Sequence, residues 1–458
     1  MPKEDSDRMT ASPDMTDTRR MTPRSSALAV TGTYPVWVAA LIMSFIVPIQ
    51  IQIGDIRLSF YRIVLLIAIV PVIRRLAVQP IRVRWVDVVF VLFALYGTLA
   101  LAATGASVPA LGISLIETIG PYMLARAFIR NADQFSAAVR VLSTSIILMI
   151  PFAIYENLTR QPIILNMLDT VFPVLPNVPH EQRLGLDRAQ VTFDHPILFG
   201  MFCAFGFAMS IYAARRRQPP KLSVFRGALV GVATFTSLSS GAFVAVGLQI
   251  VLIAYDRILR KVPKRWWILS TTIVVMYIVV ELLSNRTVAE ISIGFLALNP
   301  GTAWTRLSVN EWALEAIMTH PFFGLGFDWS WPVPFWIVTT SIDNFWLAIA
   351  FRQGLVTMLL LLLAVFGIMV TVAFTRQKDA FVNACRVSYI VTFAALSLAI
   401  VTVHLWNSAY CTFMLLLGCG LWMTDKQPDS SDVSEDEPEE DKSSGLRFSR
   451  NLHSTYHR

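Results

Sequence analysis

Five arginines are the residues of this sequence whose type and placement best suit a chemical task. They lie in two segments, at about 157–194 and 285–342, that contain no lysine. A guanidinium group is planar and permanently charged, and it can hold two oxygens of a phosphate or carboxylate at once. The five residues are Arg160, Arg183, Arg188, Arg286 and Arg306. The two segments therefore predict an anion-binding surface built from arginine alone.

Four of these arginines are candidates to hold a phosphate, and they fall into two ranks. Arg188 and Arg306 are the main candidates for a clamp on a charged leaving group, because fixed cations stabilise charge that develops in a transition state. Arg183 and Arg286 are reserve candidates in the same segments. Extension of the side chain to lipid headgroups is the alternative for all four.

Two side chains are candidates for proton transfer. Asp343, followed by Asn344, precedes a long apolar run and can act as a general base, or as the N-cap of the next helix. His195, with Asp194 beside it, stands where another apolar run begins. Its alternative is a helix start in which Asp194 is the cap.

Further polar and aromatic residues are candidates to contact a substrate. Glu156 lies where an apolar run ends, and it can hold an acceptor sugar or simply mark the interface. Trp312 is a candidate in the segment at 285–342. Nearby, Trp329, Trp331, Trp336 and Trp346 can stack on sugars or anchor the chain at a membrane surface. His320, just before Pro321, and Asn344 complete the set. Glu117 sits in the middle of an apolar run, where an ion pair is the favoured interpretation.

The second arginine segment has elements that would position these residues. Apolar residues in 305–317 recur at helical spacing, which predicts an amphipathic helix at the membrane surface. His320-Pro321 then ends the helix, and Gly324-x-Gly326 predicts a turn. The apolar run at 343–374 is too long for one crossing, so a break is expected at Gly354.

The rest of the chain is dominated by apolar runs of membrane-spanning length. Residues are 55% hydrophobic and only 15% charged, which no soluble domain of 458 residues would hide. We expect an all-α, polytopic membrane helix bundle of about 12 transmembrane helices, with a large periplasmic loop containing amphipathic helices. The predicted spans are about 34–53, 59–73, 85–103, 108–125, 136–155, 195–213, 225–238, 241–256, 267–284, 343–374 in two pieces, 387–403 and 407–423.

Charge assigns an orientation to this bundle. Basic clusters fall between alternate spans, and twelve crossings place all of them and both termini in the cytoplasm of a bacterial inner membrane. This count requires the short pair of spans to turn at Ser237–Gly241. The predicted organisation is a disordered tail at 1–33, a membrane-embedded catalytic domain at 34–424 with periplasmic loops at about 157–194 and 285–342, and a disordered acidic tail at 425–458.

Several function classes are disfavoured by what the sequence lacks. The net charge of +7 is spread over loop clusters and forms no basic stripe, so no nucleic-acid partner is expected. The four cysteines are scattered and are interpreted as packing residues. We find no phosphate-binding nucleotide loop and no cluster with metal-ligand spacing, so no cofactor and no metal site are predicted.

Three short motifs together resemble the O-antigen ligase and polysaccharide polymerase family of bacterial inner membranes. The late motif comprises Arg306, Trp312, Pro321, Gly324, Gly326, Asp343-Asn344, Leu347 and Gly354. The earlier matches are the stretch from Arg188 to His195-Pro196 and the Ser239-Ser240-Gly241 turn. The resemblance covers about 180–370 by motif. One departure is Asp343, where ligases of this family usually have histidine, and this favours a polymerase over a ligase.

The resemblance implies metal-independent glycosyl transfer outside the cytoplasm. An acceptor hydroxyl would attack the anomeric carbon of a glycan linked to undecaprenyl pyrophosphate, and the lipid pyrophosphate would leave. The first hypothesis is a polymerase that joins lipid-linked repeat units into exopolysaccharide or O-antigen. The alternatives are a ligase that transfers a lipid-linked glycan to an acceptor, and a polysaccharide-related transporter or flippase. Expected partners are the lipid-linked oligosaccharide, membrane lipids, and a chain-length regulator and flippase.

Overall fold

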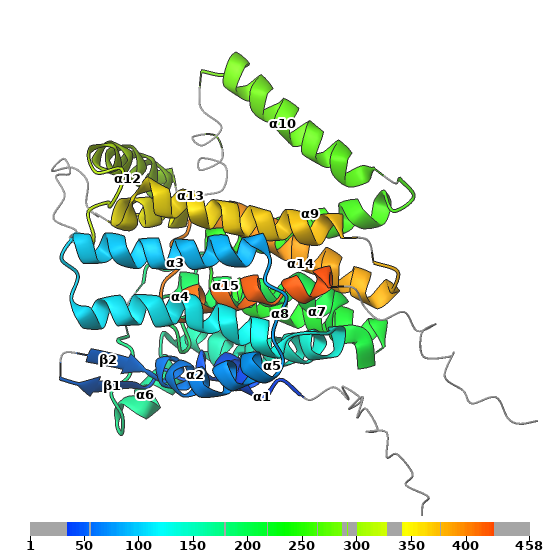
Figure 1. The fold of residues 1–458 in the computed structure, drawn as a ribbon. Coiled ribbons are helices and arrows are strands. Elements are labelled where there is room, and N and C mark those ends of the chain that lie inside the picture. Colours follow the sequence, from blue (N-terminus) through cyan, green and yellow to red (C-terminus); the bar gives the residue numbers. More distant parts are fainter. Residues whose placement is uncertain are drawn as a thin grey trace, which may run out of the picture.

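The computed structural model shows a mostly helical protein whose long helices run side by side (Figure 1). The described residues are 34–425, without 55, 178–179, 218, 263, 286–290, 292–299, 328–340 and 376. The predicted tails at 1–33 and 425–458 therefore lie outside the described residues, apart from Asp425.

Seven described helices are long and apolar enough to cross a membrane. They are α3 (Trp85–Ala103), α4 (Val108–Phe128), α5 (Ala132–Thr159), α9 (Ser240–Ile258), α10 (Arg265–Leu283), α13 (Phe345–Phe374) and α14 (Ala380–Ala399). This confirms a polytopic helical membrane protein, whereas the count of twelve crossings stays a prediction. The helix pair α8 (Pro220–Thr236) and α9 turns at residues 237–239, as the sequence predicted.

The remaining helices are too short or not apolar enough to be counted among these seven. They are α1 (Val36–Ser44), α2 (Phe60–Val78), α6 (Ile163–Asp169), α7 (Pro196–Tyr212), α12 (Pro300–Thr319), α15 (Asn407–Gly418) and the 3₁₀ turns η1 (Ala214–Arg217) and η2 (Leu421–Thr424).

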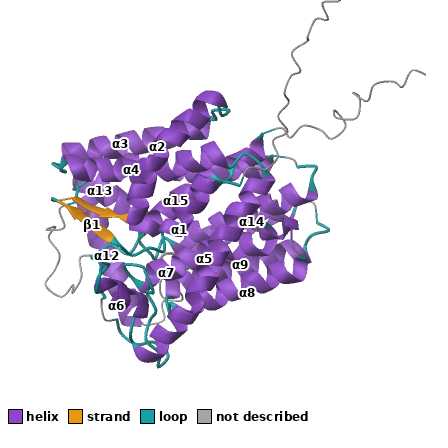
Figure 2. Cartoon of the chain, turned by 90° about the horizontal axis from the view of Figure 1, so that it is seen from below, coloured by secondary structure: helices purple, strands orange, loops and turns teal. Residues whose placement is uncertain are grey.

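The first predicted span and the all-α prediction need correction. Helix α1 ends at Ser44, and the chain then forms a two-stranded antiparallel hairpin from β1 (Gln50–Ile53) and β2 (Ile56–Ser59). Alternating Gln and Ile in β1 has the two-residue period of a strand, which an apolar-run criterion ignores. The hairpin, α6 and the loops after α5 gather at one end of the bundle, which we call the hairpin end (Figure 2).

Helix α7 lies at the centre of the bundle. Almost all of its side chains are buried, and it packs against α5, α8, α9 and α14. Helix α15 packs against α4, and α13 packs against α3. In contrast, α10 has no buried residue and stands away from the other helices (Figure 1). The mid-span carboxylate of Glu117 forms the predicted ion pair, 2.8 Å from Arg62 Nε. All four cysteines are buried, as expected of packing residues.

The structure has a helix over the predicted range 305–317 and a break at the predicted position. The place of this helix at the membrane surface stays a prediction. Helix α12 buries Val309, Ala313 and Ile317, which lie one turn apart, against the start of α13. Helix α13 is interrupted at Gly354, whose φ is 84°. The turn after α12 docks into this break, because the backbone nitrogen of Leu355 donates to the carbonyl of Pro321 at 2.7 Å.

We predict that Gly354→Ala destabilises the protein. Position 354 has a left-handed backbone, and a Cβ there would overlap the carbonyl oxygen of Phe322. The apparent melting temperature of the purified variant in detergent should fall by several degrees, as a cost of about 1–3 kcal/mol implies. Gly247→Ala is the control, because a Cβ at Gly247 meets open space on α9. Equal melting temperatures would contradict the docking of the turn into this break.

Candidate functional site

The loop that carries Arg183, Arg188 and His195 is held by the end of α5. Both carboxylate oxygens of Glu156 accept backbone N–H groups, from Gln190 and Val191, at 2.9 Å each. The side chain of Asn157 donates to the backbone carbonyls of Asp187 and Thr236. Because these backbone groups are tied to helix residues, the loop has a defined path across the hairpin end.

Arg188 is the central cation of the site. Its side chain is 9% exposed, and neither Nε nor Nη2 has a hydrogen-bond partner. Burial lowers the pKa of Arg188 to about 10, and Arg183 and Arg306 contribute to the shift. The group therefore stays cationic at neutral pH. A buried cation whose Nε and Nη2 lack partners among the described residues is costly, so this position suits an anionic ligand.

Two more arginines share this environment. Arg183 donates from Nη1 to the carbonyl of Leu238 at 3.0 Å, in the turn between α8 and α9. Arg306, on α12, places Nε 3.1 Å from Asp343 Oδ2. Burial lowers the pKa of Arg183, and the nearby charge of Arg306 lowers it further. Two segments that are far apart in the sequence, the loop before α7 and helix α12, thus place three guanidinium groups close enough to act on one another.

The charges around Arg188 are of both signs. Asp343 and Glu181 act on Arg188 in the opposite direction to Arg183 and Arg306. Arg160, Asp187 and Glu156 line the same small cavity as Arg188. The feature of the site that suits a phosphate is therefore the planar fork of each guanidinium group, which can hold two oxygens, and not an excess of positive charge.

Two histidines border the arginines and are neutral. His195 begins α7 as its N-cap, and its Nδ1 accepts the backbone N–H of Ile197 at 3.0 Å. The rings of His195 and His180 lie 4.4 Å apart. Burial is the main cause that lowers the pKa of His195 to about 3, and the nearby groups His180 and Arg188 lower it further. Burial and Arg188 lower the pKa of His180 to about 4. With Nδ1 accepting, the neutral ring of His195 carries its proton on Nε2.

Two capping alternatives from the sequence are wrong. Asn344, and not Asp343, is the N-cap of α13, since its Oδ1 accepts the backbone N–H of Leu347 at 3.2 Å. His195, and not Asp194, caps α7. Each cap is one residue further along the chain than expected, which leaves the carboxylates of Asp343 and Asp194 available for other partners.

Most of the other residues that the sequence predicted to contact a substrate are not grouped around the three arginines in the structure. Both oxygens of Glu156 accept backbone N–H groups, so it positions the loop, and its side chain also lines the small cavity beside Arg188. Its predicted contact with a sugar stays a prediction. Trp312 is 37% exposed, and exposed His320 hydrogen-bonds Thr319 at 2.8 Å. His320 lies fourteen residues after Arg306, about 21 Å along the helix axis, so it does not join the arginines. Arg286 lies outside the described residues.

Sequence reasoning missed four polar residues near the site. They are Asn157, His180, His404 and Asn407. His404 is 8% exposed, and its ring lies 5.7 Å from that of Trp406, which faces His195. None of the four belongs to a recognisable spacing pattern. The one available signal was the presence of polar side chains at the ends of apolar runs.

No group of three or more His, Cys, Asp or Glu residues in the described part of the chain could hold a metal ion. The site that is present consists of arginine, histidine and carboxylate side chains at one end of a helical bundle.

The fold and the site together define an integral membrane protein with a group of arginines at one end of its helices. Residues 225–362 match the family model described as O-antigen ligase, which confirms the resemblance to the O-antigen ligase and polymerase family. Members of this family are glycosyltransferase-like enzymes that act on lipid-linked glycans. No curated protein matches the chain. The matched region contains Arg306 and Asp343, whereas the loop with Arg183 and Arg188 precedes it.

We predict that Glu156→Gln weakens anion binding without touching the anion. The amide group would present N–H to a backbone N–H of Gln190 or Val191, and one unsatisfied pair costs about 1–3 kcal/mol. The affinity of the purified protein for inorganic pyrophosphate, measured by calorimetry, should fall about tenfold. Glu311→Gln, on the exposed face of α12, is the matched control and should bind like the wild type. An unchanged affinity in Glu156→Gln would show that the hydrogen bonds from Glu156 to the loop do not position Arg188 for anion binding.

Proposed function

We propose that this protein is a polymerase that joins undecaprenyl-pyrophosphate-linked oligosaccharide repeat units into exopolysaccharide or O-antigen. The work would take place at the periplasmic face of the bacterial inner membrane, with both termini in the cytoplasm. The observation that carries the proposal is the buried guanidinium of Arg188, which lacks partners on Nε and Nη2 and lies among the charges of Arg183 and Arg306.

The chemistry follows from where charge appears during the reaction. When the bond between the anomeric carbon and the pyrophosphate breaks, negative charge builds on the departing phosphate. Cations fixed in place before the reaction stabilise that charge with little reorganisation. Arg188 and Arg306 would hold the pyrophosphate, and Arg183 would support them. Their guanidinium groups supply the positive charge that this step requires.

Asp343 has a second task in this proposal. Its carboxylate lies 3.1 Å from Arg306 Nε, so it orients the guanidinium while leaving the other N–H groups of Arg306 free for phosphate oxygens. Asp343 as the general base stays a prediction. His195 would lie beside the pyrophosphate as a neutral imidazole, and its Nε2–H can donate to a phosphate oxygen.

The second candidate function is a ligase that transfers a finished lipid-linked glycan to an acceptor. The observation in its favour is the matched family model, which is described as O-antigen ligase. Asp343 favours the polymerase, since ligases of the resembled family usually carry histidine there. Both functions would use the same donor and the same arginines. A flippase and a chain-length regulator are the partners that a polymerase of this kind would need.

We predict that Arg306→Lys keeps the protein in the membrane but cuts polymer formation by at least tenfold. Lysine preserves one positive charge but cannot hold both Asp343 and a phosphate through a planar fork. Polymer is measured in a deletion strain that expresses the variant, with protein level checked by immunoblot. Arg57→Lys, on the exposed hairpin strand β2, is the control. Normal polymer from Arg306→Lys would exclude Arg306 from the reaction.

We predict that the deletion strain accumulates single lipid-linked repeat units. A polymerase joins such units, so its loss stops the pathway before any chain grows. A ligase acts on finished chains, so its loss would leave long lipid-linked chains without an acceptor. Gel electrophoresis or mass spectrometry of the extracted lipid-linked glycans distinguishes the two functions. Long unattached chains would overturn the polymerase assignment in favour of the ligase.

A further inference from the structure

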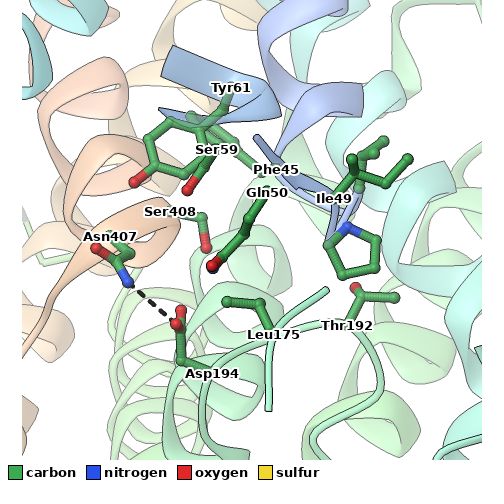
Figure 3. A pocket seen from close by; sticks show the side chains of 12 residues that line it. Phe45, Ile49, Gln50, Ser59, Tyr61, Leu175, Thr192, Asp194, Asn407 and Ser408 are labelled. Carbon is green, nitrogen blue, oxygen red and sulfur yellow. Dashed lines mark hydrogen bonds between the residues drawn. The ribbon is translucent and has the colours of Figure 1, made fainter. Parts of the chain in front are cut away.

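A small polar cavity lies between the hairpin, the start of α15 and the loop residues that precede His195. Gln50, Ser59, Tyr61, Asp194 and Ser408 contribute polar groups to its wall. Figure 3 shows the side chains of Gln50, Asp194 and Ser408 pointing into a common space. The cavity volume is about 20 Å³, which suits one water molecule or one hydroxyl group and excludes a sugar ring.

Asp194 brings an uncompensated negative charge to this cavity. Its Oδ1 accepts from Asn407 Nδ2 at 3.1 Å, and it forms no ion pair with any described residue (Figure 3). The other nearby carboxylate, Glu117, is already satisfied by Arg62 at 2.8 Å and by the hydroxyl of Tyr61 at 2.6 Å. Asp194 is therefore the carboxylate of this cluster that retains capacity to accept a proton.

Asn407 is held in an unusual conformation to make this contact. Its φ is 51°, in the left-handed region that residues other than glycine rarely occupy, although asparagine tolerates it best. Its Oδ1 accepts from Arg62 Nη2 at 3.4 Å while its Nδ2 donates to Asp194. The amide thus links the Arg62–Glu117 pair to Asp194 and fixes the direction of the Asp194 carboxylate.

One backbone step separates this cavity from the arginine site. The imidazole of His195 lies in the field of Arg183, Arg188 and Arg306, while Asp194 lines the cavity. Adjacent Cα atoms are about 3.8 Å apart. The cavity and the arginine site are therefore neighbours along the same loop.

We propose that this cavity receives the hydroxyl of the acceptor sugar and that Asp194 is the catalytic base that takes its proton. This inference rests on the proposed function. The acceptor oxygen forms a bond to the anomeric carbon, and the bond from that carbon to the pyrophosphate oxygen breaks. The hydroxyl proton passes to the Asp194 carboxylate and afterwards to water. The bonding electrons leave with the lipid pyrophosphate, whose charge the arginines hold.

The electrostatic surroundings support a base at this position. Burial raises the pKa of Asp194, and Glu117 raises it as well, while the hydrogen bond from Asn407 and the charge of Arg62 lower it. The net shift is upward. A base is more effective as its pKa approaches the working pH. The carboxylate of Asp343, in contrast, forms an ion pair with Arg306.

The test uses purified full-length protein in liposomes, supplied with lipid-linked glycan extracted from the deletion strain. Asp194→Asn should lower the rate of polymer formation about a hundredfold or more, which is the usual contribution of a general base. Its affinity for inorganic pyrophosphate should stay within about threefold of the wild type, since the arginines are unchanged. Asp169→Asn, an exposed residue at the end of α6, is the control and should match the wild type in both measurements.

The dependence of the rate on pH gives a second test that does not need Asp194→Asn to fold. The wild-type rate should fall as the pH drops through the raised pKa of Asp194, because the protonated carboxyl cannot accept a proton. Asn407→Gly keeps the left-handed backbone accessible but removes the hydrogen bond that lowers this pKa. The acid limb of its profile should therefore shift to higher pH.

The outcomes separate this inference from the proposed function. If Asp194→Asn retains more than about a tenth of the rate with an unchanged acid limb, or if it loses pyrophosphate binding, Asp194 is not the base. An acid limb that does not move in Asn407→Gly contradicts it too. Arg188→Lys should lose both rate and pyrophosphate affinity. If that variant matches the wild type in both, the proposed function itself fails.

Discussion

The candidate site depends on one unfavourable arrangement, the buried guanidinium of Arg188 with two nitrogens that have no partner. A protein that left this cation in an apolar interior would lose several kcal/mol of stability. Glu156 and Asn157 fix the path of the loop that bears Arg188. They hydrogen-bond to backbone groups and not to the guanidinium group of Arg188. A bound pyrophosphate would remove most of this cost, so binding and local stability are coupled.

The helices matter to this site chiefly by bringing three loops together. The end of α5, the turn between α8 and α9 and the start of α13 are far apart in the sequence, yet each contributes a contact to the arginine loop or to Arg306. The central position of α7 makes this possible, since its first turn begins directly after the loop and its body is buried among four helices. The buried helix α7 thus directly anchors the end of the loop that carries Arg183 and Arg188.

Helices and their breaks could be predicted from the sequence because they follow from local composition. The break at Gly354, the amphipathic α12 and the turn after α8 all have a glycine, a period or a polar interruption in the chain itself. The arginines were predicted from residue type and from the absence of lysine. The roles of Asp343, Asp194 and Glu156 were not, because partners 34 to 213 residues away decide them. The hairpin was missed because the spans were predicted from the apolar content of a run, whereas the strand signal is the alternation of Gln and Ile in β1.

The docking of α12 has a consequence for which changes the chain can absorb. Its register against α13 is set by the hydrogen bond between Pro321, beyond the end of α12, and Leu355, and by the packing of Val309, Ala313 and Ile317 on one face. Substitutions on the outer face leave that register intact. An insertion of one residue between Arg306 and Pro321 would instead turn the guanidinium by about 100° around the helix axis. Length in this stretch is therefore constrained more tightly than composition.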